Sequence, residues 1–101
     1  MEYLREYFNS DEEFNDVLKA INDSNLDEDL FIYDKDKITK IIDLFTSIGV
    51  TNIYGIFMVN ADLFGESYKY IESKVKGYDD EIELARLINE DAMNLSFINL
   101  Y

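Results

Sequence analysis

The side chains in this sequence best suited to chemistry are carboxylates, and they gather in three short clusters. The clusters are Asp11, Glu12 and Glu13; Asp27, Glu28 and Asp29; and Asp79, Asp80, Glu81 and Glu83, with Tyr78 directly before the third. Carboxylates can transfer protons in acid–base catalysis, ligate a hard cation such as Ca²⁺, or attract a basic partner. The rest of the composition and the spacing of the residues decide between these uses.

Catalysis is the least favoured use, because the chain lacks the usual catalytic partners of a carboxylate. It contains no His, whose pKa lies near neutrality, and no Cys to supply a thiolate. Twenty-two of 101 residues are Asp or Glu, so many carboxylate pairs must lie close together by chance. No glycine-rich phosphate loop, nucleophile elbow or metal-ligand spacing marks one pair as special. We therefore expect a protein that is not an enzyme, with no catalytic residue, no metal site and no cofactor.

Calcium binding is an alternative function, because residues 23–34 partly resemble the loop of an EF-hand. Oxygen ligands stand at loop positions 1, 3 and 5, which are Asp23, Asn25 and Asp27. Two departures weaken the resemblance. Glu28 stands where the sharp turn needs Gly, and Asp34 stands where a bidentate Glu closes the site. The resemblance implies a calcium-responsive module only if the loop folds around the ion despite both changes.

The charge balance favours a binding function. Nine Lys and Arg oppose the 22 acids, which gives a net charge of −13. Such a charge repels nucleic acid and anionic membranes, so we expect no direct binding to either. It also destabilises the compact state, and a basic partner would explain why that repulsion is tolerated. We therefore expect the three clusters, with Tyr78 as an aromatic anchor, to bind a basic protein.

The most concrete form of this hypothesis is an inhibitor that occupies the basic surface of a nuclease or another nucleic-acid-binding enzyme by imitating phosphate charge. Anti-defence proteins, immunity proteins and antitoxins are of this type. The many Ile, Asn, Lys, Tyr and Phe residues have AT-rich codons, which points to a low-GC bacterium or its phage. A third alternative is a structural component that self-associates through the apolar residues 53–64. The sequence leaves the oligomeric state open.

Composition and length predict one acidic globular domain over residues 1–101. Hydrophobic residues make up 48% of the chain and aromatic residues 15%, which is far from the composition of a disordered acidic segment. No apolar run approaches the ~18 residues that a membrane span needs. The first residues lack the basic and apolar regions of a secretory signal, so we expect a cytoplasmic protein.

Helical signals dominate the chain. Ser10 and Glu13 form a capping-box pattern before a helix over residues 11–21. Asp34 or Asp36 begins a second helix that ends before Gly49, where Val50 fits a Schellman motif. A third helical stripe ends at Gly77, and a last helix follows Asp79 or Asp80. In this last helix Ile82, Ala85, Leu87, Ile88 and Leu95 form the apolar side.

Three apolar segments have no interpretable period. Residues 51–60 fit a buried helix or a strand equally well, and residues 30–33 are too few to assign. The end of the chain, residues 96–100, fits a helical turn or an edge strand. We expect a mainly α domain of four to five short helices, with α+β as the alternative if a hairpin or edge strands form near residues 30–33, 52–59 and 96–100.

Overall fold

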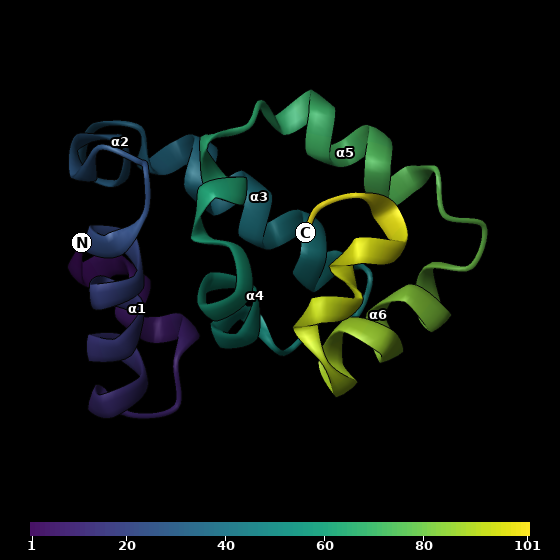
Figure 1. Cartoon of the computed structure of the whole chain (residues 1–101), viewed down its shortest axis with the longest axis horizontal. Helices are drawn as coiled ribbons and strands as arrows, with labels where there is room; N and C mark the ends of the chain where they lie inside the picture. Colours follow the sequence, from purple (N-terminus) through teal and green to yellow (C-terminus); the bar gives the residue numbers. More distant parts are fainter.

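The computed structural model describes residues 1–101 and shows a mainly α protein without β-strands (Figure 1). The α-helices are α1 (Asp11–Asp23), α2 (Glu28–Tyr33), α3 (Lys35–Ser47), α4 (Ile53–Asn60), α5 (Tyr68–Lys76) and α6 (Glu81–Glu90). The 3₁₀-helices are η1 (Glu2–Tyr7), η2 (Ala61–Gly65) and η3 (Ala92–Ile98). The mainly α prediction is confirmed. The α-helices exceed the expected four to five because two of the three ambiguous apolar segments, at 30–33 and 51–60, contribute α2 and α4.

The helix ends form largely as the sequence predicts. Ser10 Oγ accepts a hydrogen bond from the Glu13 amide at 3.1 Å. The Glu13 carboxylate accepts from the amide of Asn9, at 3.1 Å, so the reciprocal bond of the capping box reaches one residue further back. Asp80 caps α6 by accepting from the Glu83 amide at 3.1 Å. Each bond satisfies an amide that the first turn of a helix leaves without a partner.

The Schellman motif at the end of α3 is confirmed. Gly49 adopts a φ of +109°, a conformation that other residues rarely adopt. The Val50 amide then donates to the Phe45 carbonyl at 3.0 Å, and the Val50 side chain is buried. This turn sends the chain from α3 into α4.

The core explains why the ambiguous segments became helices. α4 lies in the middle of the molecule, between α1 and the pair formed by α6 and η3 (Figure 1). Phe57 of α4 stacks on Phe64 with ring centroids 4.2 Å apart, and Phe31 of α2 lies 6.3 Å from both rings. A helix covered on several sides is apolar around most of its circumference, so it shows no amphipathic period. All 27 buried residues are hydrophobic.

Near the C-terminus, one detail differs from expectation and one open alternative is decided. Ile82 was expected on the core side of the last helix, but its side chain is 82% exposed, and Leu84 is buried instead. Asp80 sets the start of α6, and the residues that then face inward are Leu84, Ala85 and Ile88. Residues 96–98 are not an edge strand but the end of η3, which stops at Asn99 with a φ of +58°.

Candidate partner-binding surface

The excess negative charge lies at the two ends of the chain and not in its middle. Residues 1–29 contain ten acids and two bases, and residues 77–101 contain six acids and one base. Residues 30–76 contain six of each and are neutral. In Figure 1, α1 and α2 lie at one end of the long axis, and the turn before α6 lies at the other. The molecule therefore has two acidic ends joined by a neutral middle.

The first cluster, at the start of α1, is largely occupied by local contacts. Asp11 forms an ion pair with Arg5, and the Glu13 carboxylate accepts from the Asn9 amide. Only Glu12 is exposed without a hydrogen bond or ion pair of its side chain. Acids in the first turn also interact favourably with the helix dipole. Most of this cluster therefore stabilises α1.

The second cluster has free carboxylates beside exposed apolar groups. Asp27 caps α2 by accepting from the Asp29 amide at 3.0 Å. The side chains of Glu28 and Asp29 are exposed and make no bond within the chain. Ile32 and Tyr33 follow at i+4 on the same helix, with 48% and 82% of their surface exposed. We call Glu28, Asp29, Ile32 and Tyr33 the α2 face.

The third cluster is held mainly by ion pairs. Lys76 Nζ lies 3.0 Å from the Glu81 carboxylate, and Arg86 Nε donates to Glu83 at 2.9 Å. The Arg86 guanidinium holds the pKa of the Glu83 carboxyl below its usual value. Asp80 caps the helix, so Asp79 alone remains free. We call Tyr78, Asp79 and Ile82 the α6 tip, where Tyr78 is half-buried and Ile82 is exposed.

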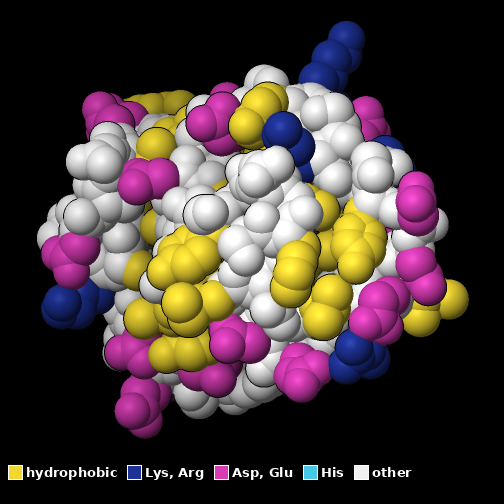
Figure 2. Space-filling view, turned by 45° about the vertical axis from the view of Figure 1, so that its right-hand side comes forward, with side chains coloured by type: hydrophobic (Ala, Val, Ile, Leu, Met, Phe, Trp, Pro, Cys, Tyr) yellow, Lys and Arg dark blue, Asp and Glu magenta, His cyan; other side chains and the backbone are white.

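The fold does not gather the three clusters into one footprint. The first and second lie at opposite ends of α1, and a helix of 13 residues is about 20 Å long. The third lies at the far end of the molecule. On the face shown in Figure 2, acidic side chains surround separate small hydrophobic patches. A single partner surface would therefore meet one acidic end, not all three clusters together.

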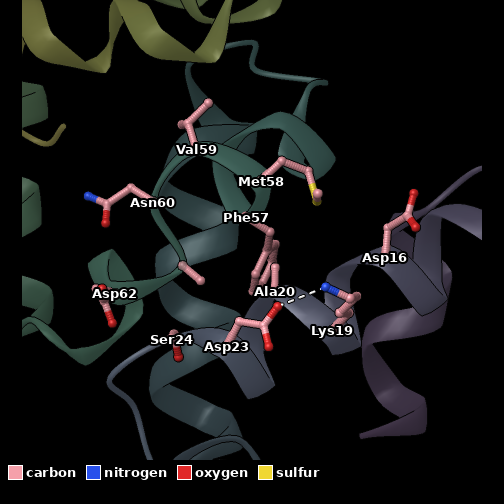
Figure 3. A pocket seen from close by; sticks show the side chains of 11 residues that line it. Asp16, Lys19, Ala20, Asp23, Ser24, Phe57, Met58, Val59, Asn60 and Asp62 are labelled. Atoms are coloured by element: carbon pink, nitrogen blue, oxygen red, sulfur yellow. Dashed lines mark hydrogen bonds and ion pairs between the residues drawn. The ribbon is translucent and has the colours of Figure 1, made fainter.

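A further acidic surface was missed by the sequence analysis. A groove of about 350 Å³ lies between α1 and the segment formed by α4 and η2. Figure 3 shows Asp16, Asp23 and Asp62 around its edge, with Ala20 and Phe57 between them. Asp16 and Asp62 stand in separate elements and belong to no run of acids, so no local pattern announces them. Only packing brings them to the same groove.

The residues proposed for calcium do not form a loop around a cation. Residues 28–33, which correspond to the second half of an EF-hand loop, form α2. Asp27 binds a backbone amide, and Asp23 pairs with Lys19. No group of three or more acidic residues lies close enough together to hold a metal ion.

The comparisons with known proteins assign no family. No protein-family model, curated protein or solved structure matches this chain. None of its helices combines the length and the apolar character needed to cross a membrane. Charge, exposure and side-chain contacts therefore carry the functional argument.

Proposed function

We propose that this protein acts by binding a basic surface of another protein, and that the α2 face is its contact surface. One observation carries the proposal: Tyr33 is 82% exposed beside the unpaired carboxylates of Glu28 and Asp29. An exposed tyrosine offers a large and rigid contact, and it is a frequent hot spot of protein interfaces. The ten acids of residues 1–29 would attract a basic partner and repel acidic ones.

The partner class follows from the same charge. Basic protein surfaces with a strong field are typical of nucleases and other nucleic-acid-binding enzymes, which use Lys and Arg to neutralise phosphates. A protein of net charge −13 on such a surface would compete with the nucleic acid. The function we propose is therefore stoichiometric inhibition, of the anti-defence, immunity-protein or antitoxin type. The apolar stretch 53–64 supports self-association less well, because Ile53, Ile56, Phe57, Leu63 and Phe64 are buried.

The test is capture of the partner by the immobilised whole chain, followed by a binding measurement with the purified partner. Nuclease-treated lysate of a low-GC bacterium is applied, and bound protein is released by a salt gradient. We expect one basic protein that binds with a defined stoichiometry and is released as the salt concentration rises. Its nucleic-acid-dependent activity should fall when this chain is added.

Three variants locate the contact. Tyr33→Ser removes the aromatic anchor, and Glu28→Gln with Asp29→Asn removes two charges from the α2 face. Asp43→Asn with Glu66→Gln is the matched control, because it removes two exposed, unpaired charges that do not adjoin the α2 face in the sequence. We expect the first two to weaken binding strongly and the control to weaken it slightly. A partner that is not basic, or equal losses in the two charge variants, would contradict the proposal.

A further inference from the structure

Three exposed aromatic side chains lie along the line where the last residues of the chain run beside α5 (Figure 1). They are Tyr70, Phe97 and Tyr101, which are 42%, 63% and 55% exposed. Two open hollows of about 230 and 250 Å³ lie between α5 and these last residues, and Asn99 lines both. We call Tyr70, Phe97 and Tyr101 the C-terminal face.

The backbone holds the end of this face in place. Asn99 has a φ of +58°, and the turn that it makes lets the Leu100 amide donate to the Leu95 carbonyl at 3.0 Å. The Asn60 side-chain amide donates to the Leu100 carbonyl at 2.6 Å. Leu100 is buried, and Tyr101 after it is exposed. Because the segment is ordered by its own bonds, less conformational entropy is lost when a partner covers it.

The charge around the C-terminal face differs from that of the two acidic ends. Residues 92–101 contain no charged side chain, and α5 contains three Lys and one Glu. Asp62 and Glu66 are the only acids that line the two hollows. Two copies with a net charge of −13 each repel one another, and the repulsion is smallest where little of this charge meets. A second copy can therefore approach more easily here than at an acidic end.

The charges beside Tyr70 can match those of a second copy. Glu66 stands four residues before Tyr70, and Lys74 stands one turn after it, with Nζ 5.3 Å from the centroid of the Tyr70 ring. Neither charge forms an ion pair within the chain. If two α5 helices lie antiparallel with their Tyr70 residues together, Lys74 of each copy faces Glu66 of the other. The contact is then made twice, as a two-fold axis requires.

We propose that two copies of this chain form a symmetric dimer through the C-terminal face, with their α5 helices antiparallel. Phe97 and Tyr101 of each copy would cover the hollows of the other, and aromatic residues are enriched in such interfaces. α2 lies at one end of the long axis, away from these residues, so both α2 faces of the dimer would stay free (Figure 1). The dimer does not require the proposed function, and it would offer a basic partner two contact surfaces.

Sedimentation equilibrium of the whole chain, over a wide range of protein concentrations at physiological salt, tests the dimer. We expect a monomer–dimer equilibrium without larger species, because a two-fold contact uses the same surface of both copies. Phe97→Ser and Tyr101→Ser should each raise the dissociation constant about tenfold or more, since each removes an aromatic contact twice. Tyr33→Ser is the matched control, because it removes an exposed tyrosine outside the C-terminal face. It should change the dissociation constant by less than about threefold.

The antiparallel arrangement is tested by reversing its two charges. Lys74→Glu and Glu66→Lys should each weaken the dimer, because like charges then meet at both contacts. Glu66→Lys also lowers the net negative charge, so relief of general repulsion alone would strengthen the dimer instead. An equimolar mixture of the two variants should dimerise again, because opposite charges then face each other between the copies. Circular dichroism checks that each variant stays folded.

Three results would overturn the dimer as proposed. A monomer at every concentration, or a dimer that Phe97→Ser and Tyr101→Ser leave intact, would show that the C-terminal face is not an interface. Species that grow beyond a dimer would indicate a head-to-tail contact in place of the two-fold one. A mixture of charge variants that stays monomeric would exclude the antiparallel arrangement. The proposed function is judged separately, by the capture of a basic protein and its dependence on Tyr33.

Discussion

The two acidic ends of the molecule are attached to the core in different ways. α2, at the N-terminal end, has a single buried residue, Phe31. The Tyr3 hydroxyl adds one bond by donating to the Phe31 carbonyl at 2.7 Å. α6, at the C-terminal end, buries Leu84, Ala85 and Ile88. A short helix with one buried side chain depends on that side chain far more than a longer helix with three.

The carboxylates of the two ends differ as well. Residues 20–34 contain no Lys or Arg, so Glu28 and Asp29 have no cation nearby in the chain. In the C-terminal cluster, Lys76 and Arg86 lie close enough to pair with Glu81 and Glu83. Acidic clusters that look alike in the sequence thus divide into one that leaves charge available to a partner and one that is mostly used within the fold.

The largest expected effect on stability comes from removing Phe31, the one buried side chain that holds α2 to the core. Phe31→Ala should destabilise the protein by about 3–5 kcal/mol, because it leaves a cavity beside Phe57 and Phe64. Urea denaturation measures the loss. In hydrogen exchange, amides of α2 should lose protection before those of α6. Ile32→Ala, at a half-exposed site, is the control and should change stability by less than about 0.5 kcal/mol.

A second prediction compares Tyr33 and Ile82, the two most exposed of the large hydrophobic side chains. Tyr33→Ser should weaken partner binding by about 2 kcal/mol, which is typical of an aromatic hot spot. Ile82→Ser, equally exposed at the α6 tip, should leave the affinity almost unchanged. Calorimetric titration with the captured partner measures both. A larger loss of affinity in Ile82→Ser than in Tyr33→Ser would show that the α6 tip, not the α2 face, is the contact surface.

The hydroxyl of Tyr3 gives a smaller effect with a defined pH dependence. Burial, with the charges of Tyr7 and Asp34, raises the pKa of Tyr3 to about 12. The folded state therefore favours the protonated phenol. Its stabilisation is complete below the usual tyrosine pKa of about 10 and is lost as the pH rises toward 12.

Tyr3→Phe should lower stability by about 1 kcal/mol at neutral pH, because the Phe31 carbonyl loses its donor. The difference from the wild-type protein should shrink as the pH rises above 10. Denaturation at several pH values, together with the absorbance of tyrosinate, measures both effects. A constant difference across this range would contradict the raised pKa of Tyr3, and no difference at neutral pH would contradict a stabilising role of its hydroxyl.

The smallest effects come from the charges themselves. Glu28→Gln with Asp29→Asn should raise the melting temperature slightly, because it relieves repulsion among unpaired acids. Glu83→Gln should lower it slightly, because it removes the partner of Arg86. The pKa of Glu83 is lowered in the fold, so its contribution is present above the usual pKa of Glu, about 4.3, and is lost at lower pH. Thermal melts near pH 7 test whether the two variants shift the melting temperature in opposite directions. Melts near pH 3 test whether the difference between Glu83→Gln and the wild-type protein disappears in acid.

Local chemistry made part of the fold predictable. The capping residues Ser10 and Asp80 and the C-terminal Gly49 act within a few residues of the chain, so their patterns identify helix ends directly. The face of α6 was less predictable. The expected stripe included Ile82, which is exposed, whereas Leu84 is buried beside Ala85 and Ile88, which were expected in the core.

For the candidate site, the sequence predicted which acids are clustered but not which of their carboxylates are free. The use of each carboxylate depends on where the helices begin. Asp27 caps α2, whereas Glu81 and Glu83 form ion pairs with cations that the helix positions bring near them. The groove acids Asp16 and Asp62 lie 46 positions apart and could not be connected in advance.

By itself, the sequence determined the net charge, the lack of histidine and cysteine chemistry, and the helices with a clear period, because these depend on composition and on contacts between near neighbours. The tertiary structure decided that residues 30–33 and 53–60 are helical. In this conformation the rings of Phe31 and Phe57 pack against each other and against Phe64 in the core. It also brought Asp16 and Asp62 to one groove, because residues 46 positions apart meet only through packing.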